Sequence, residues 1–338
     1  MATKIGINGF GRIGRCVLRA LHQRGGEGLE VAAINDLTDT NMLAHLLQYD
    51  TVHRTFDAKV EVGDGFLALG NQKIKTMAEK DPSKLPWGDL GVDIVLECTG
   101  FFRTKEAAGK HLEGGAKDVI LSAPGKGVDH TIVVGVNSDT YDRSKHKIIS
   151  NGSCTTNCLA PPAKVLLDEF GIVSGLLTTV HAYTNDQALL DVPHRKGNLR
   201  RARAAAQSMI PSTTGAAKAI YDIIPALTGK FDGMAIRVPT MDVSIVDLTV
   251  TTEKKTTVEE VNAAMKKAAN EGPMKDVMDY TDVELVSSDY IGNPASSTVD
   301  GTLTTVINDN MVKVFAWYDN EWGFSNRMID LAKIVAAG

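Results

Sequence analysis

The chain has 338 residues, 43% of them hydrophobic and 23% charged, and a formal net charge of −5. This mild acidic excess disfavours a dedicated nucleic-acid binder, and no apolar run approaches the length of a membrane span. The length is large for one core, so two domains are expected. Four cysteines are too few for a disulfide framework and no signal peptide precedes the first strand, so we expect a reducing, cytoplasmic setting.

The first predicted element is a short buried strand over residues 4–8, which runs into the glycine-rich turn GFGRIG at 9–14. Apolar residues then recur at helical spacing. This pattern between a strand and a helix is typical of a dinucleotide site. Gly9 would permit the tight turn, Gly11 would let the backbone approach a pyrophosphate, and Gly14 would let helix and strand pack closely. An ordinary glycine-rich turn is the alternative.

A second predicted strand, over residues 29–34, ends just before Asp36. Asp36 follows Gly14 at the spacing expected of a ribose-binding carboxylate. Such a carboxylate would bind the 2′-hydroxyl of NAD and repel the 2′-phosphate of NADP. A turn-forming residue at a strand end is the alternative.

Strands and helices keep alternating through the first half of the chain, which predicts a doubly wound, mostly parallel sheet with helices on both faces. The ends of its strands, where Ser122 lies, are where such sheets bind ligands. The further elements predicted here are helices at 41–48 and 104–112, and strands at 92–97, 119–122, 132–136 and 148–150.

The second half of the chain has a different sequence pattern. Its long runs alternate apolar and polar residues, as antiparallel strands with one buried face do. We therefore predict an NAD-binding domain at 1–152, an α+β catalytic domain with a mostly antiparallel sheet at 153–318, and a helix at 319–338 that returns to the first domain. The predicted strands are 173–183, 235–238, 243–252 and 302–317, and the predicted helices are 215–224, 258–269 and 322–336.

Cys154 follows small polar residues and precedes an apolar run, 159–167, that is typical of a helix. A thiol at a helix N-terminus lies in a positive field that favours the nucleophilic thiolate. A buried structural cysteine is the alternative. A reactive thiol also needs a base or a cation. His181, at the end of a predicted strand, is the candidate, although a lone histidine at a strand end is more often structural and spacing does not show that the two residues meet.

Three further features suggest anion binding. Thr214 and Gly215 precede a predicted helix and offer a hydroxyl and free amides, a natural phosphate cradle. Arg237 stands in an apolar strand, where it should have an anionic partner. The polar and basic loop at 184–207 is a solvated face, a contact for an anion and a second subunit, or a nucleic-acid patch, which the acidic total charge disfavours.

Six stretches of the chain together carry a family resemblance. They are INGFGRIGR at 7–15, SAPGKG at 122–127, SCTTNCLAP at 153–161, STTGAAKA at 212–219, RVPT at 237–240 and WYDNEWGFSNR at 317–327. With these motifs the chain resembles phosphorylating glyceraldehyde-3-phosphate dehydrogenase nearly from end to end. The resemblance implies a glycolytic or gluconeogenic oxidoreductase that converts D-glyceraldehyde 3-phosphate, phosphate and NAD to 1,3-bisphosphoglycerate and NADH.

The same resemblance implies a role for each matching residue. Cys154 would attack the aldehyde to give a thiohemiacetal and then a thioester, with His181 as base. The substrate's own phosphate would bind Thr184 and Arg237. The attacking phosphate would bind Ser153, Thr155, Thr214 and Gly215, helped by Arg201 or the adjacent Arg200. Asn320 would orient the nicotinamide, and Arg12, Ile13, Asp36, Lys80 and Ser122 would line the cofactor. The family is typically homotetrameric, with the 184–207 loop at an interface, and uses no metal.

Three other functions compete with this one. An erythrose-4-phosphate dehydrogenase would hydrolyse the thioester, but the phosphate-binding features at Thr214, Gly215 and Arg200–Arg201 argue mildly against it. A cofactor-gated binding protein would use the basic loop for nucleic acid or a partner chain, which the complete set of nucleophile and cofactor residues disfavours. A semialdehyde dehydrogenase shares the cysteine chemistry, but the long match over 184–240 disfavours it.

Overall fold

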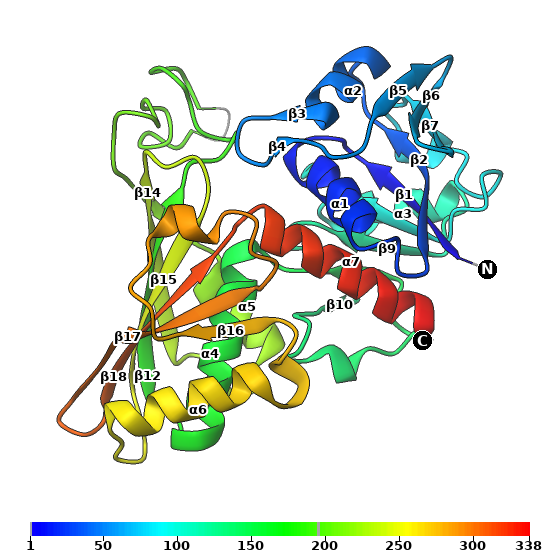
Figure 1. The fold of residues 1–338 in the computed structure, drawn as a ribbon. Coiled ribbons are helices and arrows are strands. Elements are labelled where there is room, and N and C mark those ends of the chain that lie inside the picture. The colour runs from blue at the N-terminus through cyan, green and yellow to red at the C-terminus, as the bar shows by residue number, and fades with distance from the viewer. Residues whose placement is uncertain (1, 195–196) are drawn as a thin grey trace. The chain divides into compact units, whose positions relative to one another are not determined.

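The computed structural model describes residues 2–194 and 197–338, which form two compact units (Figure 1). The first unit comprises the residues up to Ile132, Ser138–Ser153 and Phe324–Gly338, and the second comprises Val133–Asn137 and Cys154–Gly323. Arg195 and Lys196, two basic residues of the 184–207 loop, lie outside the described residues.

The first unit is built on a sheet of nine strands in its described residues. They are β1 (Thr3–Asn8), β2 (Leu29–Asn35), β5 (Val60–Gly63), β6 (Phe66–Leu69), β7 (Gln72–Met77), β8 (Ile94–Glu97), β9 (Asp118–Leu121), β10 (His130–Thr131) and β11 (Ile148–Ser150). Their order is β10-β11-β9-β8-β1-β2-β7-β6-β5, and all neighbours are parallel except in the meander β5–β6–β7. A separate ribbon pairs β3 (Tyr49–Asp50) with β4 (Arg54–Thr55). The predicted, mainly parallel sheet is confirmed.

Two helices of the first unit begin at side chains that cap free backbone amides, whereas α1 begins at Gly11 without a side-chain cap. Asp39 accepts a hydrogen bond from the amide of Met42, and Thr104 accepts one from Ala107, so two helices start where polar residues meet apolar repeats. The helices are α1 (Arg12–Gln23), α2 (Thr40–Gln48) and α3 (Lys105–Glu113), with single 3₁₀ turns at Pro82–Lys84 and Ser138–Thr140.

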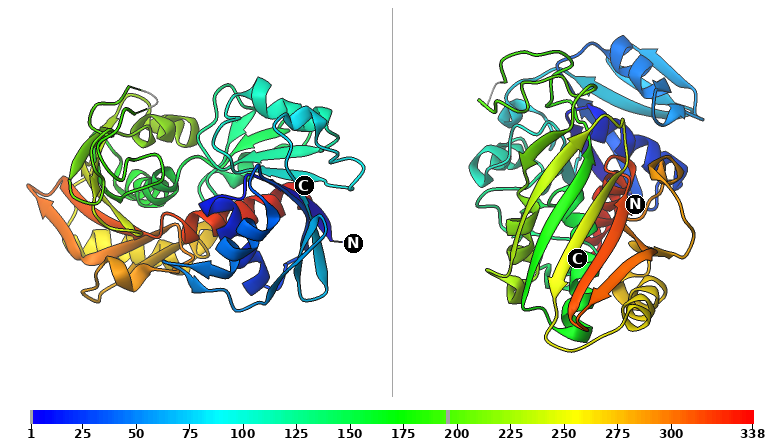
Figure 2. Two further views of the ribbon diagram at one scale, coloured as in Figure 1. Left: turned by 90° about the horizontal axis from the view of Figure 1, so that it is seen from above. Right: turned by 90° about the vertical axis from the view of Figure 1, so that its left-hand side faces the viewer.

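The last helix, α7 (Trp322–Ala337), belongs to the first unit from Phe324 onward. It lies beside α1 in Figures 1 and 2, and ion pairs join the two segments. Arg24 Nη2 is 2.5 Å from Asp330 Oδ1, and Lys333 Nζ is 2.6 Å from Glu27 Oε2. Arg24, with Lys333, lowers the pKa of Glu27 to about 2. The chain terminus is therefore tied into the first unit by charge as well as by packing.

The second unit is built on a sheet of seven strands in its described residues. They are β12 (Ser174–Ala182), β13 (Ile210–Thr213), β14 (Phe231–Val238), β15 (Ser244–Thr251), β16 (Met278–Thr281), β17 (Ser297–Ile307) and β18 (Met311–Tyr318). Their order is β13-β14-β12-β15-β18-β17-β16, and only β12–β14 and β16–β17 are parallel. The predicted, mostly antiparallel sheet is confirmed.

One face of this sheet is covered by α4 (Cys154–Phe170), α5 (Ala216–Ile223) and α6 (Val258–Asn270), and the right-hand view of Figure 2 looks onto the other face. Burial along β15 alternates strictly, so Val246, Leu248 and Val250 enter the core with Leu166 of α4. Short 3₁₀ turns lie at Pro225–Leu227, Gly272–Met274 and Ser287–Tyr290. Among the described residues, none of the helices is both long and apolar enough to cross a bilayer.

One predicted strand is wrong, and one predicted β run is divided into two strands. Residues 132–136 form a turn that follows β10, because Gly135 adopts a φ of +84° and the side chain of Asn137 accepts the amide of Val133. The run 302–317 is a hairpin of β17 and β18, since Asn308 and Asp309 both have positive φ at the turn. In the sequence, the two residues Asn308 and Asp309 are a weak turn signal between the long apolar patterns of the two strands. The meander at 60–77 was not predicted.

Candidate active site and cofactor pocket

A cavity of about 320 Å³ lies at the carboxyl edge of the first sheet. Loops that follow β1, β2, β7 and β8 line it, as expected where parallel strands end. Four residues predicted to bind the cofactor, Gly9, Gly11, Asp36 and Lys80, are among its walls. The other lining residues are Asn8, Asn35, Leu37, Glu79, Cys98, Thr99, Phe101 and Phe102.

The glycine-rich turn fits a site that a backbone must approach. Gly9 has a φ of +90°, and a Cβ there would lie 2.6 Å from the amide nitrogen of Thr99. A Cβ at Gly14 would lie 2.3 Å from the carbonyl oxygen of Gly9, so that glycine lets α1 pack on the turn. At Gly11 a Cβ would meet nothing within 4 Å, which leaves its backbone open to the pocket. These residues fit a bound dinucleotide.

The Asp36 carboxylate is held at the end of β2 by two backbone amides. Phe10 N–H donates to Oδ2 over 2.8 Å, and Thr38 N–H donates to Oδ1 over 3.0 Å. Each carboxylate oxygen can accept a further hydrogen bond. The carboxylate is thus fixed beside the glycine turn with capacity for a diol.

Arg12, Ile13 and Ser122, also predicted to bind the cofactor, do not line this cavity. Arg12 and Ile13 lie in the first turn of α1, where Arg12 pairs with the buried Asp50. Burial alone would raise the pKa of Asp50, but the amide of His53 and the Arg12 guanidinium lower it to about 2. Ser122 follows β9 and donates its amide to the carbonyl of Glu97 over 3.0 Å.

In the second unit, the structure brings Cys154 and His181 together. Cys154 is the first residue of α4, and its Sγ is 3.5 Å from Nε2 of His181 near the end of β12. The His181 side chain is buried and meets Tyr318 edge to face, with ring centroids 5.8 Å apart. The parallel register of β12 and β14 places His181 directly beside Arg237.

Nδ1 of His181 faces one acceptor and one donor. It is 2.7 Å from the carbonyl oxygen of Ala182, which can only accept, and a proton on Nδ1 would leave Nε2 facing the thiol as an acceptor. Arg237 Nη1 also lies 2.9 Å from Nδ1 and donates to the same carbonyl over 3.0 Å. Burial and the Arg237 charge lower the pKa of His181 to about 3. The imidazole is therefore neutral here.

Opposing effects act on the Cys154 thiol. Burial raises its pKa, while the positive charge of Arg237 and the amide of Thr155 at the helix start lower it, and burial is the larger effect. With a neutral imidazole beside it, the protonated thiol is the resting form. An anion bound at Arg237 would reduce the positive charge that disfavours protonation of His181. Transfer of the thiol proton to Nε2 would then become easier.

Next to this pair lies a cluster with two arginines and a single carboxylate: Arg237, Arg201 and Asp186. Arg237 Nη1 donates to Thr184 Oγ1 over 3.2 Å, and Asp186 accepts from both Thr184 and Arg201. Arg201 Nε also donates to Ser212 over 3.0 Å. Within the described part of the chain, the buried Nε of Arg237 has no hydrogen-bond partner. The excess positive charge and the open donor suit an anion.

The remaining predicted residues are held by neighbours that the sequence reasoning missed. Thr155 shares a 2.9 Å hydrogen bond with the buried Tyr318 hydroxyl. The amide oxygen of Asn320 accepts from Ser244 over 2.7 Å, and Ser244 in turn accepts the amide of Ala182, next to His181. Tyr318 lies within a matching motif, which was its only sequence signal.

Two predicted phosphate residues lie at a helix start. Thr214 accepts the amide of Ala216 over 3.2 Å, and Gly215 is the N-cap of α5, with open space where its Cβ would be. Ser153 immediately precedes Cys154 in the chain. Arg200 has its carbonyl bonded to the amide of Arg203, whereas the side chain of Arg201 enters the cluster with Asp186.

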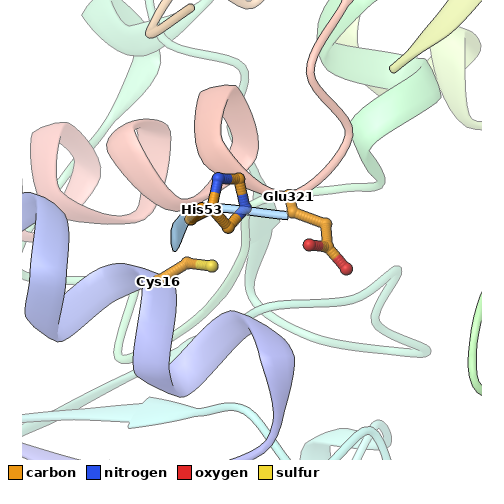
Figure 3. Close-up of side chains that lie close together, drawn as sticks. All are labelled: Cys16, His53 and Glu321. Carbon is orange, nitrogen blue, oxygen red and sulfur yellow. The ribbon is translucent and has the colours of Figure 1, made fainter. Parts of the chain in front are cut away.

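Figure 3 shows a thiol and an imidazole of the first unit close together. Cys16 projects from α1 and His53 from the turn between β3 and β4, and Sγ lies within 4.8 Å of a ring nitrogen. Glu321, drawn with them, belongs to the second unit. Two ligands from one unit fall short of the four that a structural zinc site uses, so we assign no metal to this pair.

Comparison with known proteins identifies the family. The family described as "Glyceraldehyde 3-phosphate dehydrogenase, NAD binding domain" matches residues 3–105, and "Glyceraldehyde 3-phosphate dehydrogenase, C-terminal domain" matches residues 153–320. The chain belongs to the glyceraldehyde-3-phosphate dehydrogenase family. It is an NAD-dependent dehydrogenase, which confirms the resemblance seen in the sequence and the predicted cofactor.

Full-length relatives in this glyceraldehyde-3-phosphate dehydrogenase family are similar throughout. "Glyceraldehyde-3-phosphate dehydrogenase" of Geobacillus stearothermophilus is 58% identical over 337 residues, covering 100% of this chain and 99% of the relative. "Glyceraldehyde-3-phosphate dehydrogenase 1" of Bacillus subtilis (strain 168) is 57% identical, with 99% of each chain covered. "Glyceraldehyde-3-phosphate dehydrogenase" of Streptomyces coelicolor (strain ATCC BAA-471 / A3(2) / M145) is 54% identical, with 99% of each chain covered.

Proposed function

We propose that this chain oxidises D-glyceraldehyde 3-phosphate with NAD and inorganic phosphate to 1,3-bisphosphoglycerate, through a covalent intermediate on Cys154. The observation that carries the proposal is a thiol at a helix start, 3.5 Å from a buried imidazole and next to the two-arginine cluster. A nucleophile, a base and an anion site are the groups that acyl transfer to phosphate requires.

The chemistry begins with transfer of the thiol proton to Nε2 of His181. Sulfur then forms a bond to the aldehyde carbon, the C=O π bond breaks, and His181 returns the proton from Nε2 to the oxygen, which becomes the hydroxyl of a thiohemiacetal. His181 removes that hydroxyl proton as the carbon loses a hydride, which leaves a thioester on Cys154. NAD, when bound, accepts the hydride. A phosphate oxygen then attacks the thioester carbon, the C–S bond breaks, and the sulfur leaves as the thiolate.

Two groups of residues would hold the two phosphates. Arg237, with its open Nε and its bond to Thr184, would hold the phosphate of the substrate. Ser153, Thr155, Thr214, Gly215 and Arg201 would bind the attacking phosphate. Because the substrate's dianion would offset the Arg237 charge beside His181, binding would itself prepare the base. Recognition of the phosphorylated aldehyde would thus be linked to activation of the thiol.

The test is to follow NADH absorbance with aldehyde and NAD, first with phosphate and then without it. Rapid turnover only with phosphate supports the proposal. Turnover at full rate without phosphate would contradict it and favour the hydrolytic reaction of an erythrose-4-phosphate dehydrogenase. An Arg237→Gln variant should raise KM for the phosphorylated aldehyde far more than KM for glyceraldehyde, since only the former carries the anion.

We also infer a homotetramer, which the family resemblance implies, and a cytoplasmic location, which the small number of cysteines favours. The support for a subunit interface is the loop between β12 and β13, whose Leu189, Leu190 and Leu199 are 79%, 74% and 85% exposed. Three leucines exposed in one loop are typical of a protein interface. Light scattering of the purified protein and of a Leu190→Asp variant tests this, and a monomeric wild type would contradict it.

A further inference from the structure

Behind the cofactor cavity lies a buried chain of polar side chains that the proposed chemistry does not use. Trp87, His111 and Glu97 are almost completely inaccessible to solvent, as are Asn8 and Asn35. Glu97 and His111 do not line the cavity, whereas Asn8 and Asn35 do. Burying a charged carboxylate costs free energy unless hydrogen bonds satisfy it, so Glu97 requires donors among its buried neighbours.

The hydrogen bonds fix the proton positions at one end of this chain. Trp87 Nε1 lies 3.0 Å from Nδ1 of His111, and an indole N–H can only donate. His111 Nδ1 must therefore be the acceptor, which places the proton on Nε2. That N–H donates to Oε2 of Glu97 over 3.0 Å. The tautomer of His111 is thus dictated by the tryptophan.

Glu97 is the centre of the network. Its Oε2 accepts from His111 and from Asn8 Nδ2, and its Oε1 accepts both the amide, over 2.8 Å, and the hydroxyl of Thr99. Four donors that carry no net charge therefore satisfy the buried carboxylate. Thr99 is the residue against which Gly9 packs, so the carboxylate also fixes the floor of the glycine turn.

The other end of the network reaches the cavity wall. Asn8 Oδ1 accepts from Asn35 Nδ2 over 2.7 Å, which fixes the orientation of both amides. Asn35 then pairs with the backbone of Glu79 in both directions, donating to its carbonyl over 2.9 Å and accepting its amide over 2.8 Å. Glu79 and Lys80 are both cavity residues. The network thus joins three of the loops that form the cavity.

We infer that His111 and Glu97 are positioning residues for NAD: they hold the glycine turn and the Glu79–Lys80 segment in the geometry that the adenosine half of the cofactor requires. This inference rests on the proposed use of NAD and places the cofactor in the cavity lined by Gly9, Gly11 and Asp36. Neither residue contacts the cofactor, and both act through Asn8, Asn35 and Thr99.

The test is Glu97→Gln, which keeps the side-chain shape but replaces one acceptor oxygen with a donor. Either orientation of the amide then sets its N–H groups against the donors of His111 and Asn8 or against those of Thr99. We expect the dissociation constant for NAD, measured by calorimetry, to rise about tenfold, which corresponds to about 1.4 kcal/mol. KM for NAD should rise much more than kcat falls. The control is Glu113→Gln, an exposed glutamate at the end of α3, which should leave NAD affinity unchanged.

A double variant separates positioning from general stability. Adding Trp87→Phe removes the indole donor, so His111 can move its proton to Nδ1 and accept from the new amide through Nε2. We expect the double variant to bind NAD more tightly than Glu97→Gln alone, although the smaller ring lowers its melting temperature. A Glu97→Gln protein that is less stable but binds NAD as the wild type does would overturn the inference. So would a double variant that binds no better than the single one.

The Asp36→Ala variant separates a failure of the positioning role from a failure of the cofactor's placement in this cavity. If Asp36→Ala leaves NAD affinity unchanged, the cofactor does not occupy this cavity and the placement fails. If Asp36→Ala weakens binding while Glu97→Gln does not, the placement stands and only the positioning role of Glu97 and His111 is refuted.

Discussion

Replacing His181 with asparagine tests whether the imidazole supports the Cys154 thiolate. Once the proton has moved from sulfur to Nε2, the imidazolium N–H can donate to the thiolate across the 3.5 Å that separates Sγ from Nε2. Asparagine is too weak a base to take that proton. The variant therefore loses the partner that stabilises the ionised sulfur, and we expect the thiol pKa to rise.

The size of this rise follows from the strength of the lost interaction. A hydrogen bond to a charged group contributes about 1.5–3 kcal/mol, and one pKa unit corresponds to about 1.36 kcal/mol. The thiol pKa should therefore rise by about one to two units. Because neutral pH lies below the pKa, the thiolate fraction there falls about tenfold per unit, so alkylation should slow by roughly 10- to 100-fold.

The assay is the rate of iodoacetamide reaction at Cys154, mapped on peptides over a range of pH. Burial raises the pKa of Cys98 to about 12 and also raises the pKa of Cys158. These two thiols should therefore react little with iodoacetamide below alkaline pH. His22→Asn, an exposed histidine on α1, is the matched control. A His181→Asn profile that superimposes on the wild-type profile would refute the role of the imidazole.

Three more predictions follow from the two sites. Cys154→Ser should abolish turnover while calorimetry still detects NAD binding; measurable turnover would rule out the covalent route. Asp36→Gly should raise the ratio of kcat/KM for NADP to that for NAD by about tenfold or more, because the repelling carboxylate is lost; competitive kinetics with both cofactors checks this, and an unaltered ratio would remove Asp36 as the selector. The Asp50 pKa of about 2 lies below its ordinary 3.8, so this carboxylate stabilises the fold above about pH 4 and ceases to do so as pH falls toward 2. Asp50→Asn should therefore lower the unfolding free energy by about 1–2 kcal/mol near neutral pH, with the gap closing in acid; a gap independent of pH would count against the pairing with Arg12.

The features that the sequence alone determined are those set within a few residues. The glycine turn between β1 and α1 is dictated by the absence of side chains at Gly9 and Gly14, where a Cβ would strike neighbouring backbone atoms. Asp36 directly follows β2, and Cys154 begins α4. Both places could be predicted because the nearby residues determine where a strand ends and a helix starts. The two-part architecture followed from the change of pattern between the halves.

Only the tertiary structure decided which distant side chains meet. His181 lies beside Arg237 because β12 and β14 pair in a parallel register, and a shift of one residue would turn either side chain to the opposite face. Glu97, His111 and Trp87 looked like ordinary core and helix residues, since hydrogen bonds between residues far apart in the chain leave no periodic signal. Periodicity reports which face is buried, whereas register and packing determine which side chains share a site.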